Sequence, residues 1–205
     1  HGHSPHDSVM NYDVMAADLF DFIAELGLRD VRLIGHSMGG KTILRFAQQY
    51  SFLIDRMVVA DMGMKAYPPH HDEVFKGLFA VDVENCPSRK EAEERLKAFV
   101  SDQGTLQFLL KNLFWREPGL LDWRFNLPAI YQEREHLMAA LPQERLESST
   151  LFLTGGKSHY VLPQDVDAIK QLVPQVTFDV MAGAGHWLHA EDPAQFIERT
   201  LAYLS

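Results

Sequence analysis

A short glycine–serine motif constrains this chain more than any other feature of its sequence. The residues Gly35-His36-Ser37-Met38-Gly39 have the form G-x-S-x-G. The residues before the motif, 30–34, read as a short buried strand, and Met38 to Tyr50 read as an amphipathic helix. A serine on a sharp turn between a strand and a helix is held in a strained backbone conformation, and side chains two residues to either side would clash. The motif therefore predicts a nucleophile elbow with Ser37 as the nucleophile.

The order of the remaining patterns predicts an α/β fold. Strand-like segments cover 56–61, 149–154 and 176–181, and helical patterns lie between or beside them. Between residues 62 and 147 no buried strand is expected; amphipathic helical stretches rich in aromatic residues occur instead. This order predicts a mostly parallel sheet flanked by helices with a helical cap insertion. Together with the elbow motif, it indicates an α/β-hydrolase fold. The expected division is hydrolase core at 1–61, cap or lid at 62–147, and core again at 148–205.

The charge, the apolar runs and the cysteine content limit which partners and which cell compartment we expect. The 205 residues carry a net charge of −9 with scattered Lys and Arg, which argues against a nucleic-acid partner. No apolar run has the length of a membrane span. The single cysteine, Cys86, allows no intrachain disulfide and fits a reducing compartment, so we expect a cytoplasmic protein.

A serine hydroxyl needs a neighbouring base to act as a nucleophile near neutral pH. In this strand–helix order the base follows the last strand, where Gly183-Ala184-Gly185-His186 is found. His36 lies inside the elbow, and His189 lies close to the start of the last helix. His186 is therefore the predicted base.

The acid that orients the base is harder to place. The loop after the penultimate strand, residues 155–160, contains no carboxylate. Asp165 and Asp167 fall on the following helix, where a solvated position is expected. Asp61 ends the strand after the nucleophile helix and would face the site edge of a parallel sheet. Asp61 is the predicted third member of the triad, the alternative being an aspartate that only caps a turn.

Four segments together resemble the small bacterial esterases of the YbfF type, relatives of the α/β-hydrolase domain 11 branch. They are the elbow with Gly40 and Lys41, the strand end at Asp61, the stretch Trp123-Arg124-Phe125-Asn126, and Gly183 to Glu191. The likeness covers nearly the whole chain. It implies an acid at the end of the strand after the nucleophile helix, which agrees with Asp61. It also implies hydrolysis of short acyl esters and acyl thioesters.

The start of the chain departs from this family. His1-Gly2-His3-Ser4-Pro5 resembles the family's loop after the fourth strand, so the earlier strands and one oxyanion donor are not in these residues. The Met38 N–H is the expected remaining donor to the oxyanion. We expect a longer chain or a second chain to supply the missing strands.

The resulting hypothesis is a serine carboxylesterase or thioesterase for short-to-medium acyl groups, with a small-molecule substrate and no cofactor. Phe108, Phe114 and Trp187 are the expected lining of an acyl pocket. The alternatives are a carbon–carbon hydrolase or cofactor-free haloperoxidase on the same fold, or a non-catalytic binding module. No metal site is expected, because His70-His71-Asp72 lacks the helical spacing of a zinc motif and the early histidines belong to a loop.

Overall fold

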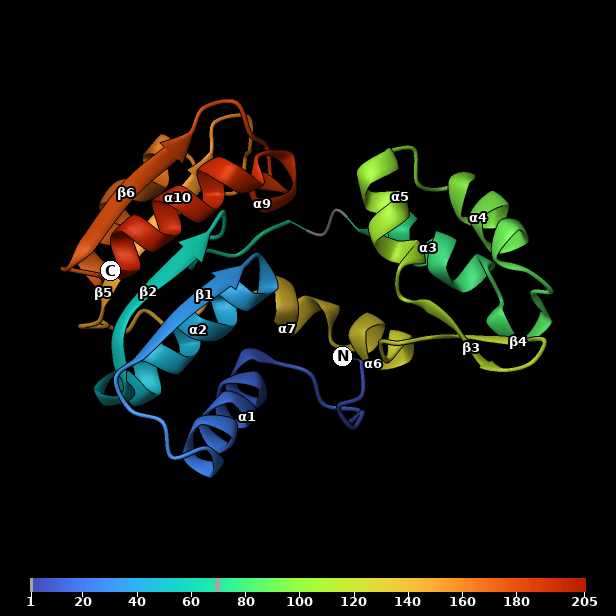
Figure 1. The fold of residues 1–205 in the computed structure, drawn as a ribbon, viewed down its shortest axis with the longest axis horizontal. Helices are drawn as coiled ribbons and strands as arrows, with labels where there is room; N and C mark the ends of the chain where they lie inside the picture. Colours follow the sequence, from blue (N-terminus) through green and yellow to red (C-terminus); the bar gives the residue numbers. More distant parts are fainter. Residues whose placement is uncertain (1, 69–70) are drawn as a thin grey trace. The chain divides into compact units, whose positions relative to one another are not determined.

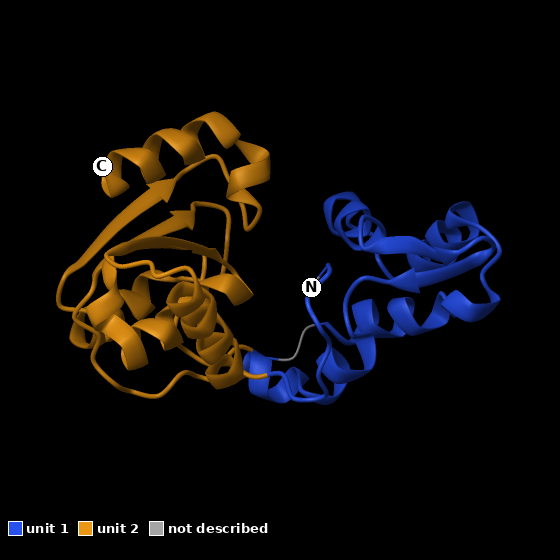
Figure 2. Ribbon diagram, turned by 60° about the horizontal axis from the view of Figure 1, so that its bottom comes forward, with its two compact units in different colours: residues 1–10, 68–138 blue, residues 11–67, 139–205 orange. Residues whose placement is uncertain are grey.

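The computed structural model of the protein describes residues 2–68 and 71–205. His1 and His70, two of the histidines considered above, lie outside the described residues. The chain divides into two compact units, unit 1 at residues 1–10 and 68–138 and unit 2 at residues 11–67 and 139–205 (Figure 2). The chain therefore passes between the units at three places, 10–11, 67–68 and 138–139.

Unit 2 contains a sheet of four strands in the order β1-β2-β5-β6, in which every neighbouring pair is parallel (Figure 1). The strands are β1 Val31–His36, β2 Ile54–Ala60, β5 Ser149–Gly155 and β6 Val176–Met181. β2 and β5 are the inner strands. Residues 57–60 of β2 and 150–155 of β5 are buried because helices cover both faces of the sheet. The predicted α/β class and the positions of all four strands are confirmed.

Alternating residues of β2 show which helix covers which face. Val58 and Ala60 belong to one apolar cluster with Leu204 of α10. Val59, between them, lies against Gly40 of α2. Since successive strand residues point to opposite faces, α2 and α10 pack on opposite sides of the sheet. The helices of unit 2 are α1 Tyr12–Glu25, α2 Met38–Tyr50, α8 Val166–Leu172, α9 Leu188–Glu191 and α10 Pro193–Leu204.

Helix α1 begins and ends where local chemistry predicts. The side chain of Asn11 accepts a hydrogen bond from the Val14 N–H at 3.0 Å and caps the first turn. Gly27 has φ +63°, a left-handed conformation that suits the residue after a helix end.

Unit 1 is built on its own apolar cluster, which includes Leu96, Leu106, Leu121 and Trp123. Its helices are α3 Asp72–Ala80, α4 Arg89–Lys97, α5 Gln103–Leu110, α6 Leu127–Gln132 and α7 Arg134–Met138. Within the described chain, every helix of either unit is too short or too polar to span a bilayer.

The sequence predicts helical stretches and no buried strand between residues 62 and 147; the structure adds a short, partly exposed hairpin there. Strands β3 Leu113–Glu117 and β4 Leu120–Trp123 form an antiparallel hairpin. Its turn is Pro118-Gly119, and Gly119 has φ +83°, as a turn with proline before glycine requires. The turn signal and the flanking aromatic residues were visible in the sequence, but they lay inside a region of helical periodicity.

The Trp123–Asn126 stretch fastens the N-terminal segment within unit 1. His6 Nε2 lies 3.1 Å from the Arg124 carbonyl oxygen, and Asn126 Nδ2 donates to the Asp7 carbonyl at 2.9 Å. The Trp123 and Phe125 rings stack at 5.3 Å. His6 therefore lies in a loop, as predicted, and its side chain contacts this stretch.

Candidate active site

Ser37 stands between β1 and α2 in a strained backbone conformation. Its φ is +54° and its ψ −120°, a combination that non-glycine residues rarely adopt. Its N–H donates to the Ala60 carbonyl of the neighbouring strand at 3.1 Å, and its carbonyl accepts the first hydrogen bond of α2, from Lys41, at 3.2 Å. The surrounding structure thus fixes the serine at the carboxyl edge of the sheet, as the elbow motif predicts.

The glycines of the elbow are not equivalent. A Cβ atom on Gly35 would lie 2.3 Å from the Gly39 carbonyl oxygen, which is closer than atoms can approach. A Cβ atom on Gly39 would have nothing within 4 Å among the described residues, and Gly39 has helical surroundings in α2. The close approach of the Gly39 backbone therefore requires glycine at position 35. Among the described residues, no atom would prevent a larger side chain at position 39.

Replacing Gly35 by alanine is expected to lower the free energy of unfolding by about 1–3 kcal/mol or more, since the added methyl would meet backbone atoms. Gly39→Ala is the matched control and should stay within about 1 kcal/mol of the parent, because alanine favours a helix. Denaturant unfolding measures both. Equal midpoints for Gly35→Ala and the parent would contradict the packing argument.

The side chains of Ser37, His186 and Asp61 form one line of hydrogen bonds within unit 2. His186 Nε2 lies 3.0 Å from Ser37 Oγ, and His186 Nδ1 lies 2.7 Å from Asp61 Oδ2. An ionised carboxylate can only accept, so Nδ1 carries the proton and Nε2 is free to accept the Ser37 hydroxyl proton. The three residues chosen from the sequence are thus brought together.

Asp61 is a fully buried carboxylate whose oxygens have several donors. It follows β2, has φ +49° and is 0% exposed. Its Oδ1 accepts from the Gly155 N–H at 3.1 Å, and its Oδ2 accepts from the Ser158 hydroxyl as well as from His186. Buried charge is tolerated only when it is bonded in this way. Gly155 and Ser158 belong to the loop that has no carboxylate of its own, so that loop serves the site by binding the carboxylate of Asp61.

Two features hold the loop that carries His186. Gly155 packs so closely on this loop that a Cβ atom there would lie 2.2 Å from the Gly185 carbonyl oxygen. The Glu191 carboxylate accepts from the N–H groups of Gly185 and Trp187, at 2.9 and 3.2 Å. The Glu191 side chain therefore fixes the residues on both sides of His186. In the sequence, Glu191 stands out only as the last residue of the segment 183–191 shared with the family.

The other two histidines near the site are held neutral by burial. Burial lowers the pKa of His36 to about 4, and its Nε2 donates to the His186 carbonyl oxygen at 2.8 Å. Burial and the neighbouring His186 also lower the pKa of His189, whose ring lies 4.6 Å from that of His36. Neither histidine contributes a positive charge beside His186 at neutral pH.

A tyrosine that the sequence did not single out covers the predicted base. The Tyr160 ring stacks on the His186 ring with centroids 4.0 Å apart and planes 19° apart. The Tyr160 N–H donates to Ser158 Oγ at 3.2 Å, and the Tyr67 hydroxyl donates to the Tyr160 carbonyl at 3.0 Å. The same short loop therefore contacts both the carboxylate and the imidazole.

Lys41 is a buried cation at the first turn of α2. It is 0% exposed, and its Nζ donates to the Ala139 carbonyl at 2.5 Å and lies over the rings of Tyr12 and Tyr67, 5.5 and 5.0 Å from their centroids. Tyr12, Tyr67 and Ala139 each lie next to one of the three places where the chain passes between the units. Lys41 thus joins these three segments of unit 2 to the nucleophile helix.

The stability difference between the parent and Lys41→Met is expected to change with pH. Burial lowers the pKa of Lys41 from 10.5 to about 8, so between these values the unfolded chain binds more protons and stability rises with pH. Burial raises the pKa of Tyr12 and Tyr67, so their stabilising effect is lost as pH rises above 10. From pH 7.5 to 9.5 the parent should gain about 2 kcal/mol relative to Lys41→Met in denaturant unfolding. Parallel stability curves would contradict this.

The remaining predicted site residues lie in different units. Met38 is the first residue of α2, where a backbone N–H has no partner within the helix. Trp187 follows the predicted base, and its ring lies 5.7 Å from that of His186. Phe108 on α5 and Phe114 on β3 belong to unit 1. The oxyanion role of Met38 and the pocket formed by these three aromatic residues therefore stay predictions.

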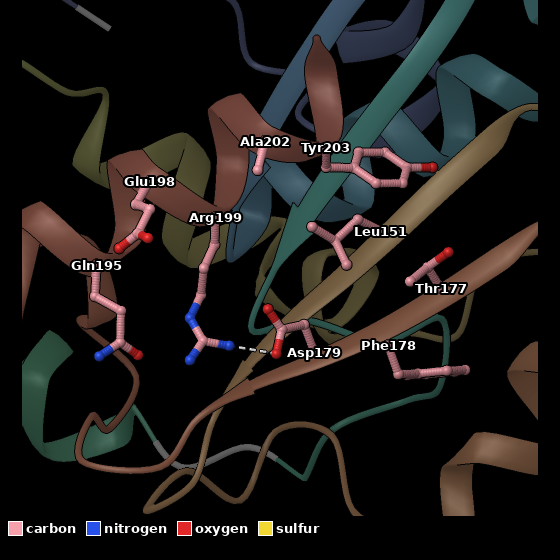
Figure 3. A pocket seen from close by; sticks show the side chains of 9 residues that line it. All are labelled: Leu151, Thr177, Phe178, Asp179, Gln195, Glu198, Arg199, Ala202 and Tyr203. Carbon is pink, nitrogen blue, oxygen red and sulfur yellow. Dashed lines mark hydrogen bonds and ion pairs between the residues drawn. The ribbon is translucent and has the colours of Figure 1, made fainter.

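An open surface pocket of about 570 Å³ lies elsewhere on unit 2, between β5, β6 and α10 (Figure 3). Its charged side chains Arg199 and Asp179 form an ion pair with each other. Ser37, Asp61 and His186 do not line this pocket. The hydrogen-bonded residues Ser37, His186 and Asp61 remain the candidate active site, because they contain a predicted nucleophile beside its predicted base. The lining residues are Leu151, Thr177, Phe178, Asp179, Gln195, Glu198, Arg199, Ala202 and Tyr203.

Comparison with known proteins finds relatives that are named esterases and lipases. The chain is 35% identical to Esterase YbfF of Escherichia coli K12 over all of this chain and 79% of the relative. It is 37% identical to the sn-1-specific diacylglycerol lipase ABHD11 of Mus musculus, over all of this chain and 69% of the relative. A solved structure described as a marine microorganism esterase superposes with a TM-score of 0.95 at 34% identity, covering 99% of this chain and 81% of that one.

The family assignment covers nearly the whole sequence. Residues 1–193 match the family described as alpha/beta hydrolase fold. The parallel sheet, the strained serine at the carboxyl edge of β1 and the relatives above point the same way. The chain belongs to the alpha/beta hydrolase fold family.

Proposed function

We propose that this chain is a serine esterase in which Ser37 is the nucleophile, His186 the base and Asp61 the residue that orients the base. The chain is a carboxylic ester hydrolase, as its relatives named esterase and lipase are. The observation that carries the triad assignment is the line of hydrogen bonds Ser37 Oγ–His186–Asp61, at 3.0 and 2.7 Å.

The reaction proceeds in two steps. His186 Nε2 takes the Ser37 proton while Oγ attacks the acyl carbon and the carbonyl electrons move to oxygen. His186 then gives the proton to the leaving alcohol or thiol, and the acyl group stays on Ser37. A water molecule, deprotonated by His186, releases the acid and restores the serine. The Asp61 carboxylate, buried and hydrogen-bonded to Nδ1, stabilises the imidazolium that forms in each step.

The substrate is a small acyl ester. Short-to-medium acyl esters are proposed from the family resemblance, with acyl thioesters as a second class. The mouse relative is named a diacylglycerol lipase, so an ester of glycerol is a further candidate. Met38 N–H as an oxyanion donor and Phe108, Phe114 and Trp187 as the acyl pocket complete the proposal. A cytoplasmic location rests only on the single cysteine, Cys86, which is buried.

The test is covalent labelling combined with a substrate panel. A fluorophosphonate should label the protein once, and peptide mapping should place the label on Ser37. The panel contains a p-nitrophenyl ester series, an acyl thioester, a diacylglycerol, a vinylogous diketone for carbon–carbon hydrolysis, and halide with peroxide. Turnover of esters with labelling at Ser37 supports the proposal; a labelled site elsewhere, or turnover only of the diketone, contradicts it.

A further inference from the structure

Among the described residues whose ring contacts with His186 are known, Tyr160 stacks on the proposed base face to face. Among the described aromatic neighbours of His186, His36 is tilted by 39° and Trp187 by 66°, whereas Tyr160 is nearly parallel at 19° with a centroid separation of 4.0 Å. A face-to-face contact lets the negative face of the phenol ring meet the whole imidazole.

We propose that Tyr160 is a catalytic residue whose ring stabilises the positive charge that His186 acquires when it takes the Ser37 proton. This proposal rests on the proposed function of the triad. A cation above an aromatic face is attracted by the ring quadrupole, and the attraction grows when water is excluded. A neutral imidazole gains much less from it, so the contact favours the charged transition state over the ground state.

The ring is held in place through its backbone. The Tyr160 N–H donates to Ser158 Oγ, which itself donates to Asp61, and the Tyr160 carbonyl accepts from Tyr67. Tyr67 in turn accepts from the Gly63 N–H at 2.8 Å. The loop therefore aligns the ring and the carboxylate on the same imidazole without relying on the packing of the ring alone.

The charges around the imidazole allow the contribution of the ring to be measured. Asp61 is bonded to Nδ1, and the Glu191 carboxylate is bonded to the N–H groups of the two residues that flank His186. Other titratable groups close by among the described residues are His36, His189 and Tyr160 itself. Burial lowers the pKa of His36 to about 4 and also lowers that of His189, while burial and then Asp61 raise the pKa of the Tyr160 hydroxyl. The lowered pKa values of the two histidines and the raised pKa of the Tyr160 hydroxyl keep these three groups neutral near pH 7.

The decisive comparison changes the charge distribution of the ring and keeps its shape. The full-length protein is prepared with Tyr160→Phe and with pentafluorophenylalanine at position 160, whose fluorines reverse the ring quadrupole. The phenylalanine variant keeps the ring quadrupole and lacks only the hydroxyl, so it is the reference against which the fluorinated variant is measured. The fluorinated variant should lose about 2- to 30-fold in kcat/KM, the range a cation–aromatic contact supplies. The acidic limb of its pH profile should move to lower pH by up to about one unit.

Equal kcat/KM and equal acidic limbs for the two aromatic variants would overturn the proposal. A loss already complete in Tyr160→Phe would also overturn it, since the hydroxyl and not the ring would then matter. Tyr160→Leu, which removes the ring, should resemble the fluorinated variant in its pH profile. Fluorophosphonate labelling of Ser37 separates the proposed serine-esterase function from the proposed role of Tyr160. If the parent protein is not labelled at Ser37, the proposed function itself is wrong. If the parent is labelled and the two aromatic variants behave alike, only the role of Tyr160 is wrong.

Discussion

Replacement of Ser37 by alanine is expected to lower kcat for ester hydrolysis by about 10⁶-fold. The alanine variant has no oxygen to attack the acyl carbon, so His186 can only activate a water molecule that the site does not position. The backbone at position 37 has φ +54°, a strained conformation that alanine also has to adopt. The fold should therefore survive with similar stability, and thermal unfolding should be measured beside activity.

The matched control is Ser101→Ala, an exposed serine in unit 1. It should keep full turnover and full fluorophosphonate labelling, whereas Ser37→Ala should lose both. A Ser37→Ala protein that keeps turnover within tenfold of the parent would end the serine mechanism. Burst kinetics with a p-nitrophenyl ester would then identify whether another residue carries the acyl group.

The second large effect is expected for Asp61→Asn, which should lower kcat by about 10⁴-fold. Asparagine has almost the same shape and tolerates the φ of +49° at this position. An amide has one acceptor oxygen, however, while Gly155, Ser158 and His186 all donate to this side chain. The amide nitrogen must then replace one of the two oxygens. A backbone N–H such as that of Gly155 can only donate, whereas the Ser158 hydroxyl can turn and accept, so the nitrogen is expected to face Ser158 and His186. His186 then loses the partner that holds its proton on Nδ1.

Asp167→Asn serves as the control for this prediction. Asp167 lies on α8 and is exposed, and it is one of the two aspartates that the sequence placed on the helix after the penultimate strand. Its variant should keep kcat, and circular dichroism should show both variants folded. If Asp167→Asn or Asp165→Asn lost activity while Asp61→Asn kept it, the acid would have been assigned to the wrong strand.

The parts of the site that the sequence predicted are those encoded by local patterns. The elbow at Ser37 follows from glycine spacing between a strand and a helix, and His186 follows from its place after the last strand. The register of β2 with β1 and β5 then carries Asp61 to the same edge. Parallel strands end at one edge of a sheet, so three residues distant in sequence are predicted to meet there.

The hairpin β3–β4 shows where local patterns failed. Leu113 to Trp123 contains apolar residues that fit either a short helix or two short strands, and periodicity alone does not separate these. The pairing of Leu113 with Trp123 decides the matter. β4 buries alternate residues, Leu121 and Trp123, in the apolar cluster of unit 1, while Leu113 is the one residue of β3 that is buried there.

By itself the sequence determined the fold class and the positions of the four parallel strands, and it predicted the three residues of the proposed triad. Only the tertiary structure identified the residues that support them. Gly155 and Ser158 reach Asp61 across 94 and 97 positions of the chain, and Lys41 reaches Ala139 across 98. The physical reason is that hydrogen bonds, ring stacking and burial depend on distances of a few ångströms, which separation along the chain does not define. The local periodicity of the sequence indicates which segments form helices and strands. The packing of these helices and strands determines which groups bind each reactive atom.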